Sequence, residues 1–160
     1  MNTYHESQPL RAPWLYLAAA FTFTVLLWAG WTEGRMLSIS FILSSCLVLA
    51  LFIALSTARL HLNFSEQGIR YRFTPFHLKT HGISWKEVKE ARLINYSALM
   101  EYGGWGIRYN IFNHTKAFVA KSGSGLLIIT SSGKKRLFSI EKPENIVHFL
   151  PSSEAFRDKI

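Results

Sequence analysis

The sequence contains few of the residues from which enzymes build reactive centres. Its 160 residues include one cysteine, Cys46, which lies in an apolar stretch and cannot form an intrachain disulfide. The only aspartate is Asp158, so no Ser–His–Asp arrangement can be placed. Of the other carboxylates, Glu87 and Glu90 alternate with lysines, as on a solvent-facing strand. We therefore predict no catalytic residues and no cofactor.

Metal ligands are equally scarce. His77 and His81 are four residues apart, a spacing that on a β-strand separates them by roughly 13 Å. One metal ion cannot bridge that distance, and no cysteine or acidic residue stands at a metal-ligand spacing from them. We predict no metal site.

Negative charge is also scarce, and the excess of positive charge is unevenly distributed. The chain has 18 Lys and Arg against 10 Asp and Glu, a net charge of +8. The first 56 residues contain two charges of each sign, so the whole excess falls in residues 57–160. A basic domain beside a membrane attracts anionic headgroups, with about 1 kcal/mol from each nearby Lys or Arg. Nucleic acid is the other common acidic partner, but a membrane anchor disfavours it, and we predict none.

Two long runs lack charge altogether, residues 14–31 with 18 residues and residues 36–56 with 21. As α-helices they would be roughly 27 and 31 Å long, which matches a hydrocarbon core of about 30 Å. Lipid satisfies no backbone group, so such segments must be helical. We predict a two-helix transmembrane hairpin over residues 14–56. A cleaved signal peptide is the alternative for the first run, but its length and the absence of an Ala-x-Ala pattern favour a retained anchor.

Basic residues near the ends of these runs indicate the orientation. The loop between the runs carries only Arg35. The flanking segments carry four arginines, namely Arg11, Arg59, Arg70 and Arg72. By the positive-inside rule we expect both termini to lie in the cytoplasm.

The interior of the runs argues against transport. No ionisable side chain lies inside either run, and a proton relay or an ion path would need one. Small residues in the second run either form a helix-packing face or are simply tolerated there: Ser38, Ser40, Ser44 and Ser45.

From residue 60 the hydrophobic pattern alternates with period two, as in β-strands. The predicted elements are a β-hairpin over 60–74, strands at 77–81, 88–96, 107–112, 116–120, 126–130 and 136–140, and an amphipathic helix over 143–150. A tight turn at 131–134 joins the last two strands. The predicted fold class is α+β, a transmembrane helical hairpin followed by a small antiparallel β half-barrel with a closing C-terminal helix. The expected divisions are an unstructured N-terminal tail at 1–13, the hairpin at 14–56, the domain at 57–150 and a flexible tail at 151–160.

A resemblance to a known family rests on the octapeptide Tyr102-Gly103-Gly104-Trp105-Gly106-Ile107-Arg108-Tyr109. It resembles a signature of small bacterial membrane proteins with a pleckstrin-homology-like (PH-like) domain. Residues 68–76, 84–88 and 142–144 and the two spans are similar as well, so the resemblance covers residues 14–150. It implies a PH-like fold in a bacterial inner membrane and no reaction. The sequence differs at 110–114, where relatives often have a glycine-rich stretch.

Two sets of residues are candidates for binding. The first is the glycine loop, Tyr102, Gly103, Gly104, Trp105, Gly106 and Arg108, where exposed backbone N–H groups would approach an anion or a partner. The alternative for this loop is a tight bend that places Trp105 against the barrel. The second set would contact anionic lipid headgroups: Arg70, Arg72, Lys134, Lys135 and Arg136. The turn at 66–68 carries no Lys or Arg, so we do not expect the inositol-lipid specificity of many PH domains.

These observations favour a non-catalytic PH-like binding or assembly module, anchored in a bacterial inner membrane. Its expected partners are the membrane, anionic headgroups, and another membrane protein or a second copy. One alternative is a membrane-surface enzyme acting on lipid headgroups with Glu101, Arg108 or His114. The other is an accessory subunit that recognises its complex through the serine face of the second span.

Overall fold

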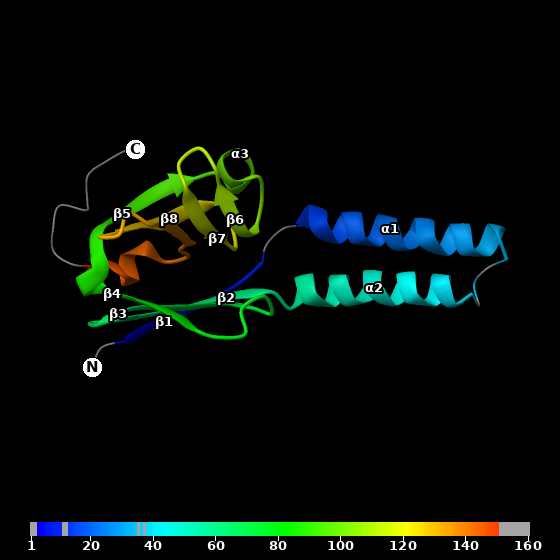
Figure 1. The fold of residues 1–160 in the computed structure, drawn as a ribbon, viewed down its shortest axis with the longest axis horizontal. Coiled ribbons are helices and arrows are strands. Elements are labelled where there is room, and N and C mark those ends of the chain that lie inside the picture. Colours follow the sequence, from blue (N-terminus) through cyan, green and yellow to red (C-terminus); the bar gives the residue numbers. More distant parts are fainter. Residues whose placement is uncertain (1–2, 11–12, 35, 37, 151–160) are drawn as a thin grey trace. The chain divides into compact units, whose positions relative to one another are not determined.

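The computed structural model describes residues 3–10, 13–34, 36 and 38–150. The chain divides into two compact units: residues 12–57, and a second unit that joins residues 1–11 to residues 58–160. The first holds the two long helices, and the second, the β unit, holds all the described strands (Figure 1). The helices are thus an insertion in the sequence of the β unit. The predicted flexible tail at 151–160 lies outside the described residues.

The long helices, α1 (Pro13–Thr32) and α2 (Ile39–Ser56), are apolar around their whole circumference. Large side chains on them stay exposed, among them Phe21 at 72%, Trp31 at 77% and Leu47 at 62%. A helix that is apolar on all sides and is not covered by protein fits lipid better than water. Both helices are long and apolar enough to cross a membrane. The expected pair of candidate spans is therefore present.

The two helices pack against each other near both of their ends. The rings of Tyr16 and Phe52 meet edge to face with centroids 6.1 Å apart. At the other end Gly30 is buried, and a Cβ added there would lie 2.4 Å from the ring of Phe41. Only glycine admits so close an approach.

The predicted serine face of α2 is only partly covered. Ser44 and Ser45 are half-buried, whereas Ser40 is exposed. Ser38 precedes the helix and caps it, because its Oγ accepts a hydrogen bond from the Phe41 amide.

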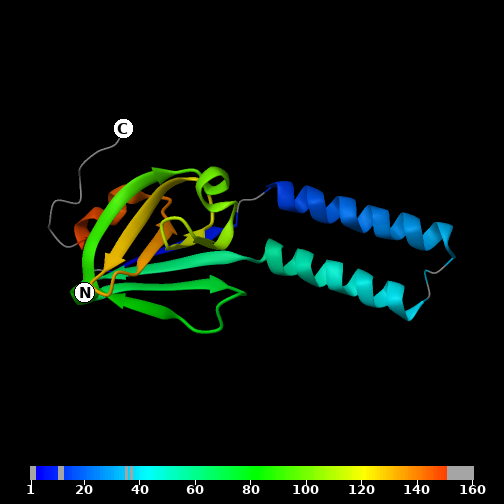
Figure 2. The ribbon, with the colours of Figure 1, turned by 45° about the horizontal axis from the view of Figure 1, so that its top comes forward.

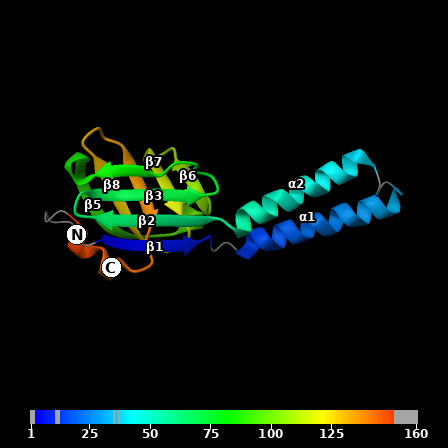
Figure 3. The same cartoon turned by 90° about the horizontal axis from the view of Figure 1, so that it is seen from below.

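The first four strands form an antiparallel sheet, sheet A, in the order β1 (Thr3–Pro9), β2 (Arg59–Ser65), β3 (Gly68–Thr74) and β4 (His81–Ser84) (Figure 3). β2 and β3 confirm the predicted hairpin at 60–74. Alternate side chains on both strands are buried, as the period-two pattern requires.

β1 corrects the expectation that residues 1–13 are an unstructured tail. The strand pairs with β2 along its full length and ends with Pro9 opposite Arg59. Its inward side chains include Glu6 and Gln8, so no apolar alternation marks it in the sequence.

The remaining five strands are β5 (Val88–Tyr96), β6 (Gly106–Asn110), β7 (Thr115–Val119), β8 (Gly123–Thr130) and β9 (Lys135–Ser139). They form sheet B in the order β5-β8-β9-β7-β6. β7 and β9 run parallel, which corrects the expected purely antiparallel barrel. The reason is that the β6–β7 hairpin adds beside β9, the strand made last.

The two sheets pack face to face in the β unit (Figure 2). Phe118 of β7 and Phe138 of β9 stack with ring centroids 5.1 Å apart, and the ring of Tyr71 from β3 lies 4.8 Å from each. All three side chains are at most 5% exposed. These rings form an aromatic centre to the core between the sheets.

Two predicted connections are wrong. Residues 77–81 were expected as a strand, but only His81 lies in one, as the first residue of β4. Residues 77–80 follow a turn in which the His77 amide donates to Phe73 O at 2.7 Å. In place of a helix over 143–150 there are two short 3₁₀ turns, η2 (Pro143–Asn145) and η3 (Val147–Phe149). Short runs are the usual form of this helix. Two more elements precede β5 and β6, namely η1 (Trp85–Glu87) and α3 (Ala98–Tyr102).

Candidate functional site

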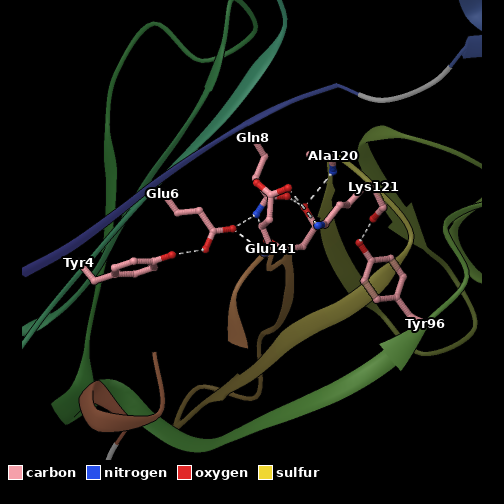
Figure 4. A network of polar contacts seen from close by, with 8 residues as sticks. Tyr4, Glu6, Gln8, Tyr96, Ala120, Lys121 and Glu141 are labelled. Atoms are coloured by element: carbon pink, nitrogen blue, oxygen red, sulfur yellow. Dashed lines mark hydrogen bonds and ion pairs between the residues drawn. The ribbon is translucent and has the colours of Figure 1, made fainter. Parts of the chain in front are cut away.

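A buried polar network joins the inner face of β1 to the end of β9 (Figure 4). Gln8, 1% exposed, donates from Nε2 to Ser139 O at 2.8 Å. Its Oε1 accepts from the Ser139 hydroxyl at 3.0 Å, and that hydroxyl oxygen also accepts from the Ala120 amide. Because each of these buried groups has a partner, the network is stabilising.

Glu6 extends the network to the residue after β9. Its Oε1 accepts from the Glu141 amide at 2.6 Å and from the Gln8 side chain, and its Oε2 accepts from the Tyr4 hydroxyl at 3.2 Å. Lys121 Nζ lies 3.3 Å from a Glu141 carboxylate oxygen. These contacts hold the two sheets together at the edge formed by β1. The role of this network is therefore structural.

The predicted glycine loop closes on itself. α3 ends at Tyr102 and is capped by Gly103, whose φ of 67° lies in the left-handed region that favours glycine. Arg108 donates from Nε to Trp105 O at 2.8 Å, and its guanidinium lies against Gly104. Tyr102 is buried, with its ring 5.8 Å from that of Tyr96.

Trp105 packs, partly buried, against the cluster that contains Tyr96 and Tyr102. Gly103 is exposed and Gly106 is half-buried. These contacts are those of a tight bend, one of the two alternatives that the sequence predicted for this loop. Ligand or partner contact by the loop stays a prediction.

Two histidines, His77 and His81, lie beside the ring of Tyr71, with centroids 6.2 and 5.5 Å from it. The rings of His77 and His81 are 4.8 Å apart, far closer than the roughly 13 Å expected for a strand, because His77 lies outside β4. Burial, with the nearby His81 and Lys116, lowers the pKa of His77. Its Nδ1 accepts from the Phe73 amide at 3.3 Å. Among the described residues no group of three or more His, Cys, Asp or Glu is placed to hold a metal ion.

An open cavity of about 340 Å³ lies between the β8–β9 turn and η1. It is lined by Lys86, Glu87, Thr130, Ser131, Ser132, Lys134 and Arg136. The two segments are fixed to each other, since the amide and the hydroxyl of Ser131 donate to Glu87 O at 2.8 and 3.2 Å. Arg136 also lies near Tyr71, whose pKa is raised by burial and lowered to a smaller extent by this guanidinium.

The structure divides the predicted basic set into two. Lys134 and Arg136 line the cavity, whereas their neighbour Lys135 does not. Arg70 and Arg72 project from the opposite, outward face of sheet A. Sequence reasoning missed Lys86 as a member of the cavity. Its only signal was its place in 84–88, one of the segments that carry the family resemblance.

The outward face of sheet A, here called the cationic face, presents no carboxylate among the described residues. Its titratable side chains are His5, Arg59, His61, Arg70 and Arg72. His61 stands opposite Arg72, and its ring stacks on that of His5 at 6.2 Å. Partial burial, together with His5, Arg59 and Arg72, lowers the pKa of His61. Arg59, Arg70 and Arg72 give this face a positive charge, so it favours an anionic surface as its neighbour.

Exposed apolar side chains gather on α3 and the β6–β7 turn. Met100 is 85% exposed and Phe112 is 100% exposed, with Leu99 and Ile111 beside them in the sequence. The two segments are joined because Asn110 Nδ2 donates to a backbone oxygen of α3 at 2.8 Å. We call these four side chains the apolar patch.

The residues of the enzymatic alternative each make a local contact. Glu101 accepts from the Ser97 amide at 2.8 Å, and His114 Nδ1 lies 3.3 Å from the Tyr109 hydroxyl. Arg108 bonds within the glycine loop. In the described part of the chain no hydrogen bond joins the three, and none of them lines the cavity.

The chain matches no protein-family model, no curated protein and no solved structure.

Proposed function

We propose that this chain is a membrane-anchored binding module whose β unit engages anionic groups and performs no reaction. The observation that carries the proposal is the cationic face, where three arginines and two histidines stand without a carboxylate among the described residues. Two candidate membrane spans in the same chain support a bilayer as the neighbour. Anionic headgroups attract surface Lys and Arg by about 1 kcal/mol each.

We further propose a PH-like domain in a bacterial inner membrane, with both termini in the cytoplasm. The glycine-loop signature and a strand-rich unit with eight of its nine strands after the two spans support the family. The β1–β2 pair supports the placement of both termini on the same side of the membrane. Pro9 is the last strand residue before the helices, Arg59 is the first strand residue after them, and the two are opposite one another in the sheet. The excess of arginine in the flanking segments supports the cytoplasmic side.

The test is the lipid that the full-length protein retains in a mild uncharged detergent. In the Arg70→Gln/Arg72→Gln variant, we expect the ratio of retained phosphatidylglycerol to phosphatidylethanolamine to fall severalfold. Lys89→Gln, an exposed lysine on β5, is the matched control and should leave the ratio unchanged. An unaltered ratio in the double variant would remove the cationic face as the binding surface.

A second candidate is an accessory subunit that contacts its complex through the apolar patch of the β unit, rather than through the serine face expected from the sequence, since exposed apolar side chains that lie together often mark protein interfaces. Its occupant would be another membrane protein of the same complex. A Met100→Ser/Phe112→Ser variant should then lose a stoichiometric partner from the detergent eluate while keeping its lipids. Retention of the partner by this variant would contradict the alternative.

A further inference from the structure

We propose that the cavity between η1 and the β8–β9 turn is a binding site for a phosphate monoester. This goes beyond attraction to a charged surface, because the cavity is a defined concave site and lies apart from the cationic face. Three cations converge on it: Lys86 from one segment, and Lys134 and Arg136 from the other. In the described part of the chain none of the three forms an ion pair with a carboxylate.

Backbone hydrogen bonds fix the two segments that carry these charges. Ser131 donates twice to Glu87 O, and Lys134 O accepts from the Thr130 amide at 3.0 Å, so both segments are fixed. The cations therefore cannot separate by loop movement without breaking these bonds. Among the described residues Glu87 is the only carboxylate that lines the cavity, which leaves an excess of two positive charges. A doubly charged anion would neutralise that excess.

The lining hydroxyls Ser131, Thr130 and Ser132 already have partners within the protein. Ser131 donates to Glu87 O. Thr130 Oγ1 donates to Lys134 O and accepts from the Lys134 amide, both at 3.2 Å, and it lies 3.0 Å from Ser132 Oγ. Because a hydroxyl has one hydrogen, Ser132 is then the donor to Thr130. The two ammonium groups and the guanidinium therefore supply the donors for an oxyanion ligand.

The chemistry of the donors selects phosphate. A guanidinium matches two phosphate oxygens at once, and lysine supplies compact charge. At about 340 Å³ the cavity is at the lower end of the range for small-molecule sites, about 300–1,000 Å³. We therefore infer that the ligand is a phosphate monoester. Either a soluble metabolite or a lipid headgroup would provide this group.

The experiment is isothermal titration calorimetry on the full-length protein in an uncharged detergent at low salt. The probes are glycerol 3-phosphate and dihexanoyl phosphatidic acid, and methyl sulfate is the singly charged comparison. We expect both phosphates to bind more tightly than methyl sulfate. Binding of only one phosphate would identify the source as soluble or lipid.

Variants from the two segments test the site itself. Lys134→Gln/Arg136→Gln, and separately Lys86→Gln, should weaken phosphate binding by about tenfold or more, because hydrogen bonds to charged groups are lost. Lys135→Gln, at the start of β9 and outside the cavity, removes one charge as Lys86→Gln does, and should alter binding less than twofold. Arg70→Gln/Arg72→Gln should leave phosphate binding intact, so that this site and the cationic face fail or succeed separately. No binding of either phosphate, or an equal loss in Lys135→Gln, would overturn the proposal.

Discussion

The five-residue strand β9 connects two polar regions that differ in burial and in whether their polar groups have partners. At its end, Ser139 belongs to a buried network in which the side chains of Glu6 and Gln8 have partners. At its start, Arg136 lines an open cavity where three cations make no ion pair with a described carboxylate. Buried polar groups destabilise a fold unless they are bonded, whereas exposed charges need no partner. The first region therefore holds the sheets together, and the second is available to a ligand.

The largest effect should come from the buried end. Gln8→Leu removes both hydrogen bonds to Ser139 and leaves buried groups unpaired, so we expect the free energy of unfolding to fall by about 2–4 kcal/mol. Ser7→Ala, on the exposed face of the same strand, should change it by less than about 0.5 kcal/mol. Urea unfolding followed by tryptophan fluorescence gives both values. Equal stabilities of the two variants would mean that the network contributes nothing.

The buried network and the hydrogen bonds between β1 and β2 should hold β1 in place without the helices. The Leu10 amide donates to Ala58 O at 3.0 Å, so an Asn-Gly turn can join these residues in place of 11–57. We expect a water-soluble domain that unfolds cooperatively, within about 2 kcal/mol of the full chain. Circular dichroism and analytical ultracentrifugation check the fold and the solubility. An excised domain without a cooperative transition would show that β1 depends on the helices.

A smaller change in stability would show whether the glycine loop, like the buried network, has only a structural role. Gly103 has positive φ and open space around its missing Cβ, so Gly103→Ala should lower the unfolding free energy by about 1 kcal/mol through backbone strain alone. Gly82→Ala on β4, with an ordinary φ and its nearest contact at 3.9 Å, is the control and should be neutral. A loop that serves only as a bend would show this loss with lipid and partner retention unchanged.

At the open end, removal of charge should hardly affect stability. Lys134→Gln is expected to change the free energy of unfolding by less than about 0.5 kcal/mol, because the side chain is exposed. Relief of repulsion should make the variant less dependent on salt than the parent. Thermal unfolding at two ionic strengths measures both. A loss as large as that of Gln8→Leu would erase the contrast between the two ends of β9.

The smallest effect concerns pH. The pKa of His77 is lowered in the folded state, so below its unfolded value near 6.5 the unfolded chain binds more protons. Stability is therefore complete above that pH and decreases as the pH falls through 6.5 towards the lower folded pKa. Protonation of Nδ1 would also break the bond from the Phe73 amide. His77→Gln should flatten this part of the melting temperature profile, and a profile as steep as that of the parent would argue against His77.

Sequence patterns predicted those parts whose signal is local. Long uncharged runs predicted α1 and α2, and apolar alternation predicted the β2–β3 hairpin and most of sheet B. β1 escaped because its inward side chains include Glu6 and Gln8, whose partners lie some 130 residues away. Lys86 escaped for the same reason, since only tertiary bonds bring it to Lys134. In both cases polar residues acquire their role from distant parts of the chain.

The interruption of sheet A by the helices sets an order of events during synthesis. β1 is made first, but its partner β2 follows only after the whole hairpin, which at about 5–20 residues per second takes roughly 3–10 s. If both helices cross the bilayer, Arg59 can reach Pro9 only when the second crossing returns the chain to its starting side. A chain with one failed crossing would leave β1 without its partner. Completion of the sheet thus requires that β1 and β2 lie on the same side of the bilayer, which a single crossing does not allow.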